Sequence, residues 1–229
     1  MSELLHIDGS QGEGGGQVLR TALGLSLVTG RAFQIDAIRA RRRKPGLMRQ
    51  HLTAVMAASD VGRARLSGAE IGSTSLRFEP GEVRAGEYEF RIGTAGSTSL
   101  VLQALLPAML VSAQDWFVRI HGGTHNRMAP TALVVRLPRT IAKRKSAERV
   151  AHSCLDEAKD FLAHDAPIEK HLCDQLLLPL ALAGGGSFRT TAPTAHSLTN
   201  AEVIRAFLPI DIRFEKEPTR AWLVTLATA

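Results

Sequence analysis

A glycine-rich stretch, Gly9 to Gly16, stands between a short apolar run and an apolar-periodic segment that ends near Gly30. Five of its eight residues are glycine. A helix that begins directly after such a loop exposes backbone N–H groups at the positive end of its dipole, where phosphate oxygens bind well. Glycine has no side chain, so the backbone can approach the anion closely. The stretch therefore predicts a phosphate-binding loop.

The loop follows neither of the two common phosphate-binding patterns. A Walker A loop ends in Gly-Lys-Ser/Thr, and the dinucleotide pattern needs a third glycine where Gln17 stands. Its unusual residue is Glu13, because a carboxylate beside bound phosphates repels them unless a cation lies between. Glu13 therefore indicates a divalent metal. The alternative is a glycine-rich strand-to-helix turn in which Glu13 is a solvated carboxylate.

The composition indicates a globular protein with an anionic partner. The chain has 229 residues, of which 45% are hydrophobic, and this is enough to build a core. The net charge of +6 is concentrated at Arg39 to Lys44 and at Lys143 to Lys145. Such an excess favours nucleic acid or a nucleotide as the partner.

The remaining composition excludes two other classes of protein. No segment reaches the roughly 20 apolar residues of a membrane span, and the N-terminus lacks a signal-peptide pattern. We therefore expect a cytoplasmic protein with no membrane partner. Cys154 and Cys173 are not in CxxC spacing, which excludes a disulfide framework or a zinc site. Both thiols are expected to be reduced and structural.

Hydrophobic periodicity predicts strands alternating with helices, which is an α/β (α+β) fold. Strands are expected at 4–7, 32–38, 88–92, 117–120, 187–191, 210–214 and 222–225, with two more between 63 and 78. Helices are expected at 16–28, 48–58, 97–110, from 131 onward, at 168–183 with a stop at Gly184 to Gly186, and at 200–207. The order βαβαββ begins again near residue 88. Such a repeat predicts similar modules around a pseudo-threefold axis, each with two helices on one sheet face.

Four sequence motifs resemble those of the RNA 3′-terminal phosphate cyclases, in the order of that family. They are Ile7 to Gln17, Lys44 to Leu47 with Gln50-His51, His121 to Thr124, and His196 to Asn200. The resemblance implies one core domain over 1–229, with repeats at about 3–85, 86–142 and 146–229.

The resemblance also implies a missing middle. About a hundred family residues have no counterpart around Pro138 to Lys145, which would leave sheet edges unpaired. The inserted smaller domain of the family is therefore expected to be absent, together with the strands on either side of it. The second and third repeats are incomplete in this interpretation.

By this resemblance, His196 is a nucleophile that forms a covalent intermediate. Its unprotonated ring nitrogen attacks the α-phosphate of ATP and expels pyrophosphate. The adenylyl group then passes to an RNA 3′-phosphate, and the adjacent 2′-hydroxyl closes a 2′,3′-cyclic phosphate with release of AMP. Without the resemblance, His196 is an ordinary helix-entry residue beside a cap at Ser197 or Thr199.

The resemblance assigns the other site residues in groups. Glu13 binds Mg²⁺ or Mn²⁺, while Gln17, Arg20 and Gln103 contact the nucleotide. The phosphates or the RNA end contact Arg39, Arg42, Gln50 and His51. Two alternatives stay open: the basic run is a solvated surface, and Gln103 is a helical residue that faces solvent.

The adenine base is expected between two segments. Pro130 forms one side, and the other side is formed by His171, Leu172, Cys173, Asp174 and Gln175. Family members usually have tyrosine where His171 stands, so the stacking area is smaller here. His121, His125, His152 and His164 show no pattern of a metal cluster.

The sequence therefore predicts an ATP-dependent RNA 3′-phosphate cyclase core, with ATP and RNA as partners and no specified oligomeric state. One rival is a non-catalytic RNA-binding relative that acts in RNA processing or ribosome assembly. The missing middle favours this rival, whereas the presence of Glu13, Arg20 and His196 argues against it. The other rival, an enolpyruvyl transferase, has the same repeat architecture but no role for the His196 motif.

Overall fold

The computed structural model describes residues 4–12, 15–112, 114–123 and 166–228. Strands alternate with helices along these residues, which confirms the mixed α/β class. Glu13, Pro130, the helix expected from residue 131 and the break at Pro138 to Lys145 lie outside the described residues. The elements are β1 (Leu5–Asp8), α1 (Gly16–Thr29), β2 (Phe33–Asp36), α2 (Arg49–Gly62), β3 (Arg65–Ser67), β4 (Leu76–Glu79), β5 (Glu87–Arg91), α3 (Thr98–Val111), β6 (Phe117–His121), α5 (Lys170–Leu182), β7 (Gly185–Thr190), α6 (Ala195–Phe207), β8 (Ile210–Lys216) and β9 (Trp222–Thr228).

The first and last sheets have the same pairing order. In the first, β1 is parallel to β2, β2 is antiparallel to β4, and β4 is antiparallel to β3. In the last, Ile168 forms a parallel bridge with Thr190 of β7, β7 is antiparallel to β9, and β9 is antiparallel to β8. The first unit consists of β1 to β4 with their helices, and the last unit consists of β7 to β9 with theirs. Each of these two units therefore places its last strand between two others in its sheet.

The middle unit contributes a two-stranded sheet, in which β5 and β6 are parallel. These two strands correspond to β1 and β2 of the first unit, because each pair is joined through a helix. Within the residues that the structure describes, the middle unit has no antiparallel pair like β3 and β4. It is therefore the least complete of the three sheets.

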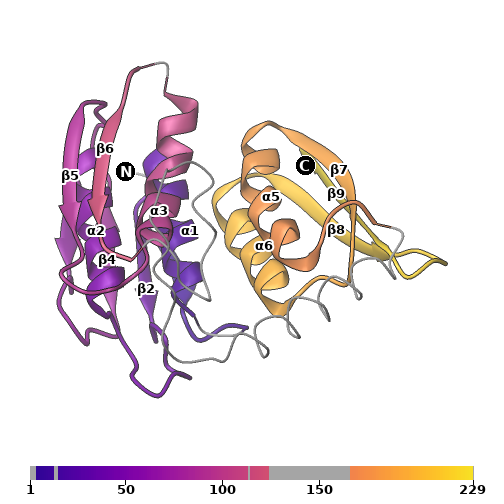
Figure 1. Ribbon diagram of the computed structural model, residues 1–229, viewed down its shortest axis with the longest axis horizontal. Coiled ribbons are helices and arrows are strands. Elements are labelled where there is room, and N and C mark those ends of the chain that lie inside the picture. Colours follow the sequence, from indigo (N-terminus) through magenta and orange to yellow (C-terminus); the bar gives the residue numbers. More distant parts are fainter. Residues whose placement is uncertain (1–3, 13–14, 113, 124–165, 229) are drawn as a thin grey trace, which may run out of the picture.

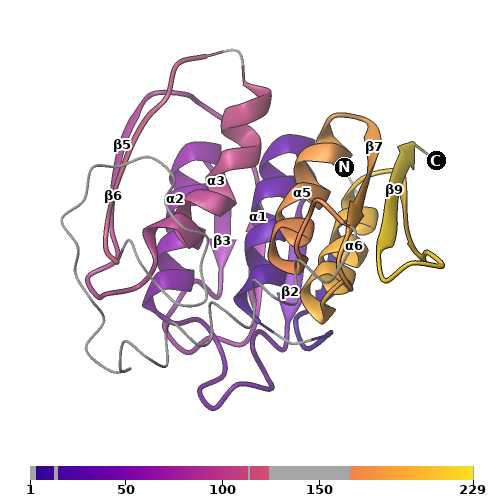
Figure 2. The same ribbon diagram turned by 45° about the vertical axis from the view of Figure 1, so that its right-hand side comes forward.

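The helices lie between the sheets. Figure 1 shows β5 and β6 on one side and β7, β8 and β9 on the other, with α1, α3, α5 and α6 between them. The view turned by 45° keeps this arrangement (Figure 2). Helix α1 contacts α2, α3 and α6, so it is the central helix of the layer.

The sheet core follows from the alternation of side chains along each strand. In β2, Phe33 and Ile35 are buried, whereas Gln34 and Asp36 point to the other face. Phe33 stacks on Phe78 of β4 with ring centroids 5.6 Å apart, and it meets Phe207 of α6 edge-on at 6.1 Å. The aromatic contact to α6 joins the first unit to the last.

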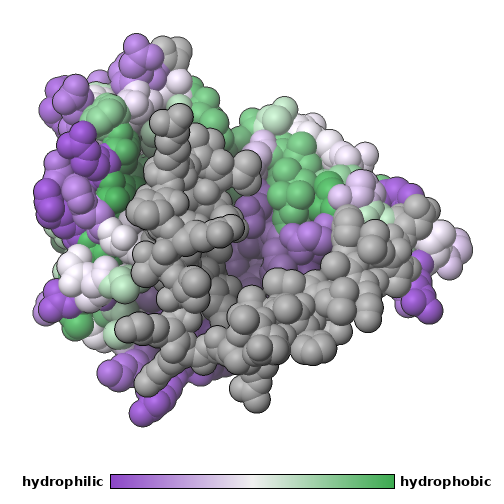
Figure 3. All heavy atoms as spheres, in the orientation of Figure 1, coloured by the Kyte–Doolittle hydropathy of each residue, from purple (hydrophilic) through white to green (hydrophobic). Residues whose placement is uncertain are grey.

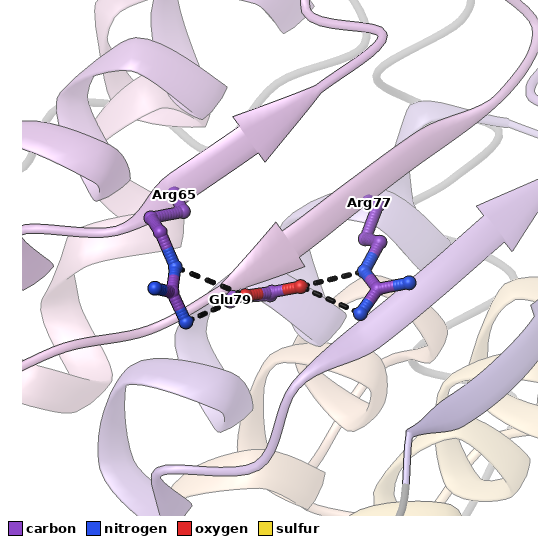
Figure 4. Close-up of polar contacts among 3 residues, drawn as sticks. All are labelled: Arg65, Arg77 and Glu79. Atoms are coloured by element: carbon purple, nitrogen blue, oxygen red, sulfur yellow. Dashed lines mark hydrogen bonds and ion pairs between the residues drawn. The ribbon is translucent and has the colours of Figure 1, made fainter.

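The outer faces are polar, with small apolar areas beside them. On the first sheet, Glu79 pairs with Arg65 at 3.0 Å and with Arg77 at 2.6 Å (Figure 4). Exposed ion pairs of this kind contribute roughly 0–1 kcal/mol each. Hydrophilic residues cover the edge of the molecule over β5 and β6, and hydrophobic surface appears near the upper end of α3 (Figure 3). The exposed apolar residues of α3 are Leu106, Leu110 and Val111.

Two predicted helix boundaries are wrong. Helix α6 begins at Ala195 and not at residue 200, because the side chain of Thr194 caps it by accepting a hydrogen bond from Ser197 N at 3.2 Å. Helix α5 ends at Leu182, close to the predicted end, and Gly184 follows with a left-handed φ of 89°, whereas Gly185 and Gly186 belong to β7. The second wrong boundary is the end of α2, which lies at Gly62 and not at residue 58. By contrast, the predicted stop of α1 at Gly30 is confirmed, with a left-handed φ of 69°. Among the described helices, none is long and apolar enough to cross a membrane.

Candidate active site

Three helices begin at the glycine loop. Gly15 caps α1, and a methyl group at Gly15 would lie 3.3 Å from Arg42 Nη2 and 3.9 Å from His196 Cε1. A methyl group at Gly16 would collide with His51 Nε2. His51 is the third residue of α2, and His196 is in the first turn of α6. The positive ends of α1, α2 and α6 therefore meet at one place, which suits an anion.

The hydrogen bonding of His51 fixes its protonation state. Its Nδ1 accepts a hydrogen bond from the backbone N–H of Met48 at 3.2 Å, so the ring proton is on Nε2. Burial, together with the charges of Arg39 and Arg20, lowers the pKa of His51 to about 3. The imidazole is thus neutral, and its Nε2–H can donate toward the glycine loop.

The low pKa of His51 makes the stability of the protein depend on pH. The folded protein binds the ring proton more weakly than the unfolded chain, whose pKa is about 6.5. This contribution to stability is present above pH 6.5 and is lost as the pH falls toward 3. We expect urea unfolding to show about 1–2 kcal/mol less stability at pH 5 than at pH 7 because of this group.

His51→Asn is the matched variant for this measurement, since asparagine keeps an acceptor but cannot be protonated. We expect the variant to lose most of the pH dependence between pH 7 and pH 5. Equal pH dependence in the variant and the wild type would show that His51 is not the responsible group.

Arg20 places a buried positive charge beside the same loop. Its side chain is 9% exposed, and its Nε donates to Gln103 Oε1 of α3 at 3.0 Å. Burial lowers the pKa of Arg20 to about 10, whereas the charge of Asp174 raises it, so the guanidinium stays charged at neutral pH. Gln103 therefore orients Arg20 and does not simply face solvent.

Asp174 of α5 connects α1 to α6. Gln17 Nε2 donates to Asp174 Oδ1 at 2.5 Å, and Asn200 Nδ2 donates to the same oxygen at 3.1 Å. Burial raises the pKa of Asp174, whereas the hydrogen bond from Gln17 and the charge of His196 lower it. Asn200 also accepts a hydrogen bond from Thr21 Oγ1 at 2.8 Å. Thr21 was not named from the sequence, and Asn200 was named only as the end of the His196 motif, without a role. Each follows a predicted site residue by four positions, the spacing of one helix face.

The arginines of the basic loop before α2 have two roles: some lie beside the glycine loop, and one holds the backbone of its own loop. Arg42 is exposed and lies beside Gly15, and Arg41 Nη1 donates to the carbonyl of Gly12 at 3.1 Å. Arg39 instead turns toward its own loop and donates to the carbonyls of Lys44 and Gly46, both at 2.8 Å. Gln50 Oε1 accepts from the backbone N–H of Ser97 at 2.7 Å, before α3. Arg39 and Gln50 thus hold backbone next to the site.

The segment expected to contact adenine begins α5. Glu169 caps this helix by accepting from the backbone N–H groups of His171 and Leu172 at 2.7 and 2.6 Å. His171, Leu172 and Gln175 are exposed, while Cys173 is fully buried. Burial raises the pKa of the Cys173 thiol, in keeping with a reduced structural residue. The structure thus presents three of the five predicted residues at the surface.

The comparisons with known proteins decide the family. The model of the family described as RNA 3′-terminal phosphate cyclase matches residues 11–139 and 135–214. This chain belongs to the RNA 3′-terminal phosphate cyclase family. The two matches meet at residues 135–139, beside the predicted break at Pro138 to Lys145.

Curated bacterial relatives named RNA 3′-terminal phosphate cyclase align with the chain nearly end to end. The protein of Salmonella agona (strain SL483) is 34% identical over 328 residues, covering 94% of this chain and 95% of the relative. That of Koribacter versatilis (strain Ellin345) is 35% identical and covers 93% and 92%. The alignment with the Salmonella agona protein has 328 positions, whereas this chain has 229 residues. At least 99 of those positions therefore have no residue of this chain. The chain is therefore a shortened member of its family.

Proposed function

We propose that this protein adenylylates itself on His196 and passes the adenylyl group to an RNA 3′-phosphate, which closes to a 2′,3′-cyclic phosphate. The observation that carries the proposal is the position of His196, in the first turn of α6 beside Gly15 and Arg42. The name shared by the relatives supports the reaction. We expect the reaction to take place in the cytoplasm.

In the first step, a lone pair of the unprotonated His196 ring forms a bond to the α-phosphorus of ATP. The bond from this phosphorus to the bridging oxygen breaks, and pyrophosphate leaves with the electron pair. The negative charge that develops would face the N–H groups at the start of α1, the guanidinium of Arg20 and the Nε2–H of His51. Donors already held in place stabilise such charge without reorganisation.

In the second step, an oxygen of the RNA 3′-phosphate attacks the adenylyl phosphorus, and the bond to His196 breaks. In the third, the 2′-hydroxyl oxygen attacks the RNA phosphorus, loses its proton and expels AMP. Arg42 and the exposed Arg41 would attract the RNA end to the loop, because both guanidiniums lie at its rim.

We propose that Mg²⁺ or Mn²⁺ enters with ATP and meets the carboxylate of Glu13. The residues that the structure describes contain no group of three or more His, Cys, Asp or Glu side chains placed to hold a metal. A magnesium ion carried by the phosphates needs only one or two protein carboxylates. Excess chelator should therefore abolish labelling of the protein by ATP, and added Mg²⁺ should restore it. Equal labelling with and without chelator would contradict this proposal.

The test of the function is incubation with ATP that carries radiolabel in its α-phosphate, followed by a denaturing gel. We expect a labelled protein band, and we expect unlabelled RNA with a 3′-phosphate to chase the label into AMP. The RNA product should then resist a phosphatase that removes open 3′-phosphates. RNA binding without any labelled band would instead identify a non-catalytic relative, which the absence of at least 99 positions favours.

We also propose that the three units are related by a pseudo-threefold axis. The equal pairing order of the first and last sheets supports this arrangement. A crystal structure in which the units superpose by rotations far from 120° would contradict it.

A further inference from the structure

We infer that Thr21 and Asn200 are positioning residues for the reaction, because they fix the register of α6 along α1 and so hold His196 at the glycine loop. The inference rests on the proposed role of His196. Neither residue contacts the loop in this interpretation. Their effect reaches the reacting nitrogen through the helix that carries it.

Helices α1 and α6 run side by side in the same direction. His196 lies beside Gly15 at the start of α1, and Asn200 bonds Thr21 further along it. A helix rises about 1.5 Å per residue, so Asn200 is about 6 Å beyond His196, and Thr21 is about 7.5 Å beyond Gly16. The distance from the loop contact to the Thr21–Asn200 hydrogen bond is therefore similar along α1 and along α6. Two helices that pack in parallel require such equal spacing.

The side-chain amide of Asn200 is bonded on both of its ends. Its Oδ1 accepts from Thr21 Oγ1 at 2.8 Å, and its Nδ2 donates to the carbonyl of Asp174 at 3.2 Å and to Oδ1 of Asp174 at 3.1 Å. Thr21 and Asn200 are 5% and 4% exposed, so water does not replace a lost partner easily. The same Asp174 oxygen accepts from Gln17.

This network selects one register, which apolar packing alone does not. Helices α1 and α6 also pack against each other, and their buried residues include the aliphatic Leu25, Ala201 and Ile204. At the far end of the pair, Arg31 donates to the carbonyls of Ala206 and Phe207 at 2.9 and 3.2 Å. Aliphatic surfaces tolerate sliding, whereas hydrogen bonds are lost when donor and acceptor separate by more than a few tenths of an ångström. A shift of α6 by one residue would break the bond of Asn200 to Thr21 and move His196 by about 1.5 Å.

The experiment compares Thr21→Val with Thr21→Ser and with the control Ser26→Ala. Valine keeps the shape of threonine but removes the hydroxyl, and serine keeps the hydroxyl. Ser26 is on the same helix, is fully buried, and donates from Oγ to the carbonyl of Arg31 at 2.6 Å. Arg31 bonds the C-terminal end of α6, so loss of the Ser26 hydroxyl is a comparable defect at the opposite end of the helix pair from His196. A displacement of about 1 Å can cost about 100-fold in rate.

We expect Thr21→Val to lower the rate of His196 labelling at saturating ATP by about 10- to 100-fold, with KM for ATP changed less than about threefold. Thr21→Ser should restore most of the rate, and Ser26→Ala should label as the wild type does. Equal rates for Thr21→Val and Ser26→Ala, after correction for folded protein, would overturn the inference.

A second readout keeps the inference separate from the proposed function. If wild-type protein takes no label, the proposed function fails, but the position of the ring is still measurable by NMR. The His196 ring signals are assigned as those missing in His196→Asn. We expect Thr21→Val to shift or split these signals and Ser26→Ala to leave them in place. Unchanged His196 signals in Thr21→Val would overturn the inference whatever the activity.

Discussion

On the proposed mechanism, His196→Asn should abolish the covalent AMP adduct, while the affinity for ATP should stay within about threefold of wild type. Asparagine keeps much of the size and polarity of histidine but has no nucleophilic ring nitrogen. The start of α6 should persist, because its cap depends on Thr194 and not on residue 196. Gel labelling with α-labelled ATP measures the adduct, and equilibrium binding measures the affinity.

The matched control for this variant is His121→Asn. His121 is an exposed histidine of β6 that pairs with Glu89 of β5 at 3.0 Å. The His121→Asn variant should take up label at the wild-type rate. Wild-type labelling of His196→Asn, in a form that is labile to acid and stable to base, would assign the nucleophile to another residue.

Arg20→Ala should lower the labelling rate by about 10²- to 10³-fold, the usual cost of losing one well-placed donor to developing charge. The effect is large because the guanidinium is buried, held by Gln103, and next to the first residue of α1. Arg20→Lys keeps the positive charge but loses the planar group that Gln103 orients, so its labelling rate should lie between those of the wild type and Arg20→Ala. Single-turnover labelling measures all three proteins.

Arg65→Ala provides the control for removing a positive charge, since Arg65 is 88% exposed on the outer face of the first sheet. Its labelling rate should equal that of the wild type. A similar loss in Arg65→Ala and Arg20→Ala would mean that overall charge, rather than the placement of Arg20, controls the rate. Thermal unfolding of Arg20→Ala separates lost activity from lost structure.

The parts of the fold that the sequence predicted are those fixed by local pattern. Helix α1 was predicted from its apolar periodicity and from Gly30, whose φ of 69° suits glycine. Helix α6 was predicted to start five residues late, because its first turn, Ala195 to Thr199, includes polar residues typical of a loop. The decisive feature was the cap by Thr194, which competes with other Ser and Thr residues in the same stretch.

The parts of the site that the sequence did not predict depend on contacts between distant segments. Gln17 is 157 positions from Asp174, and Thr21 is 179 positions from Asn200, so no local pattern indicates either bond. Arg39 was grouped with Arg42 because the resemblance places both near the phosphates or the RNA end. Its backbone has φ of 53°, and its side chain donates to the carbonyls of Lys44 and Gly46 in its own loop. Charge patterning identified the loop, but the direction of each side chain required the folded backbone.

The hydrogen bonds of α1 to α5 and α6 place the site at the interface between the N-terminal and C-terminal parts of the chain. The glycine loop, Arg20 and His51 come from residues before 124, whereas Asp174, His196 and Asn200 come from residues after 165. Neither part contains both the proposed nucleophile and the proposed phosphate-binding loop. A chain cut between them would recover adenylylation only when the two fragments associate. On the proposed mechanism, covalent labelling of His196 is thus also an assay of fragment complementation, because a radioactive band would appear only when the two fragments have associated.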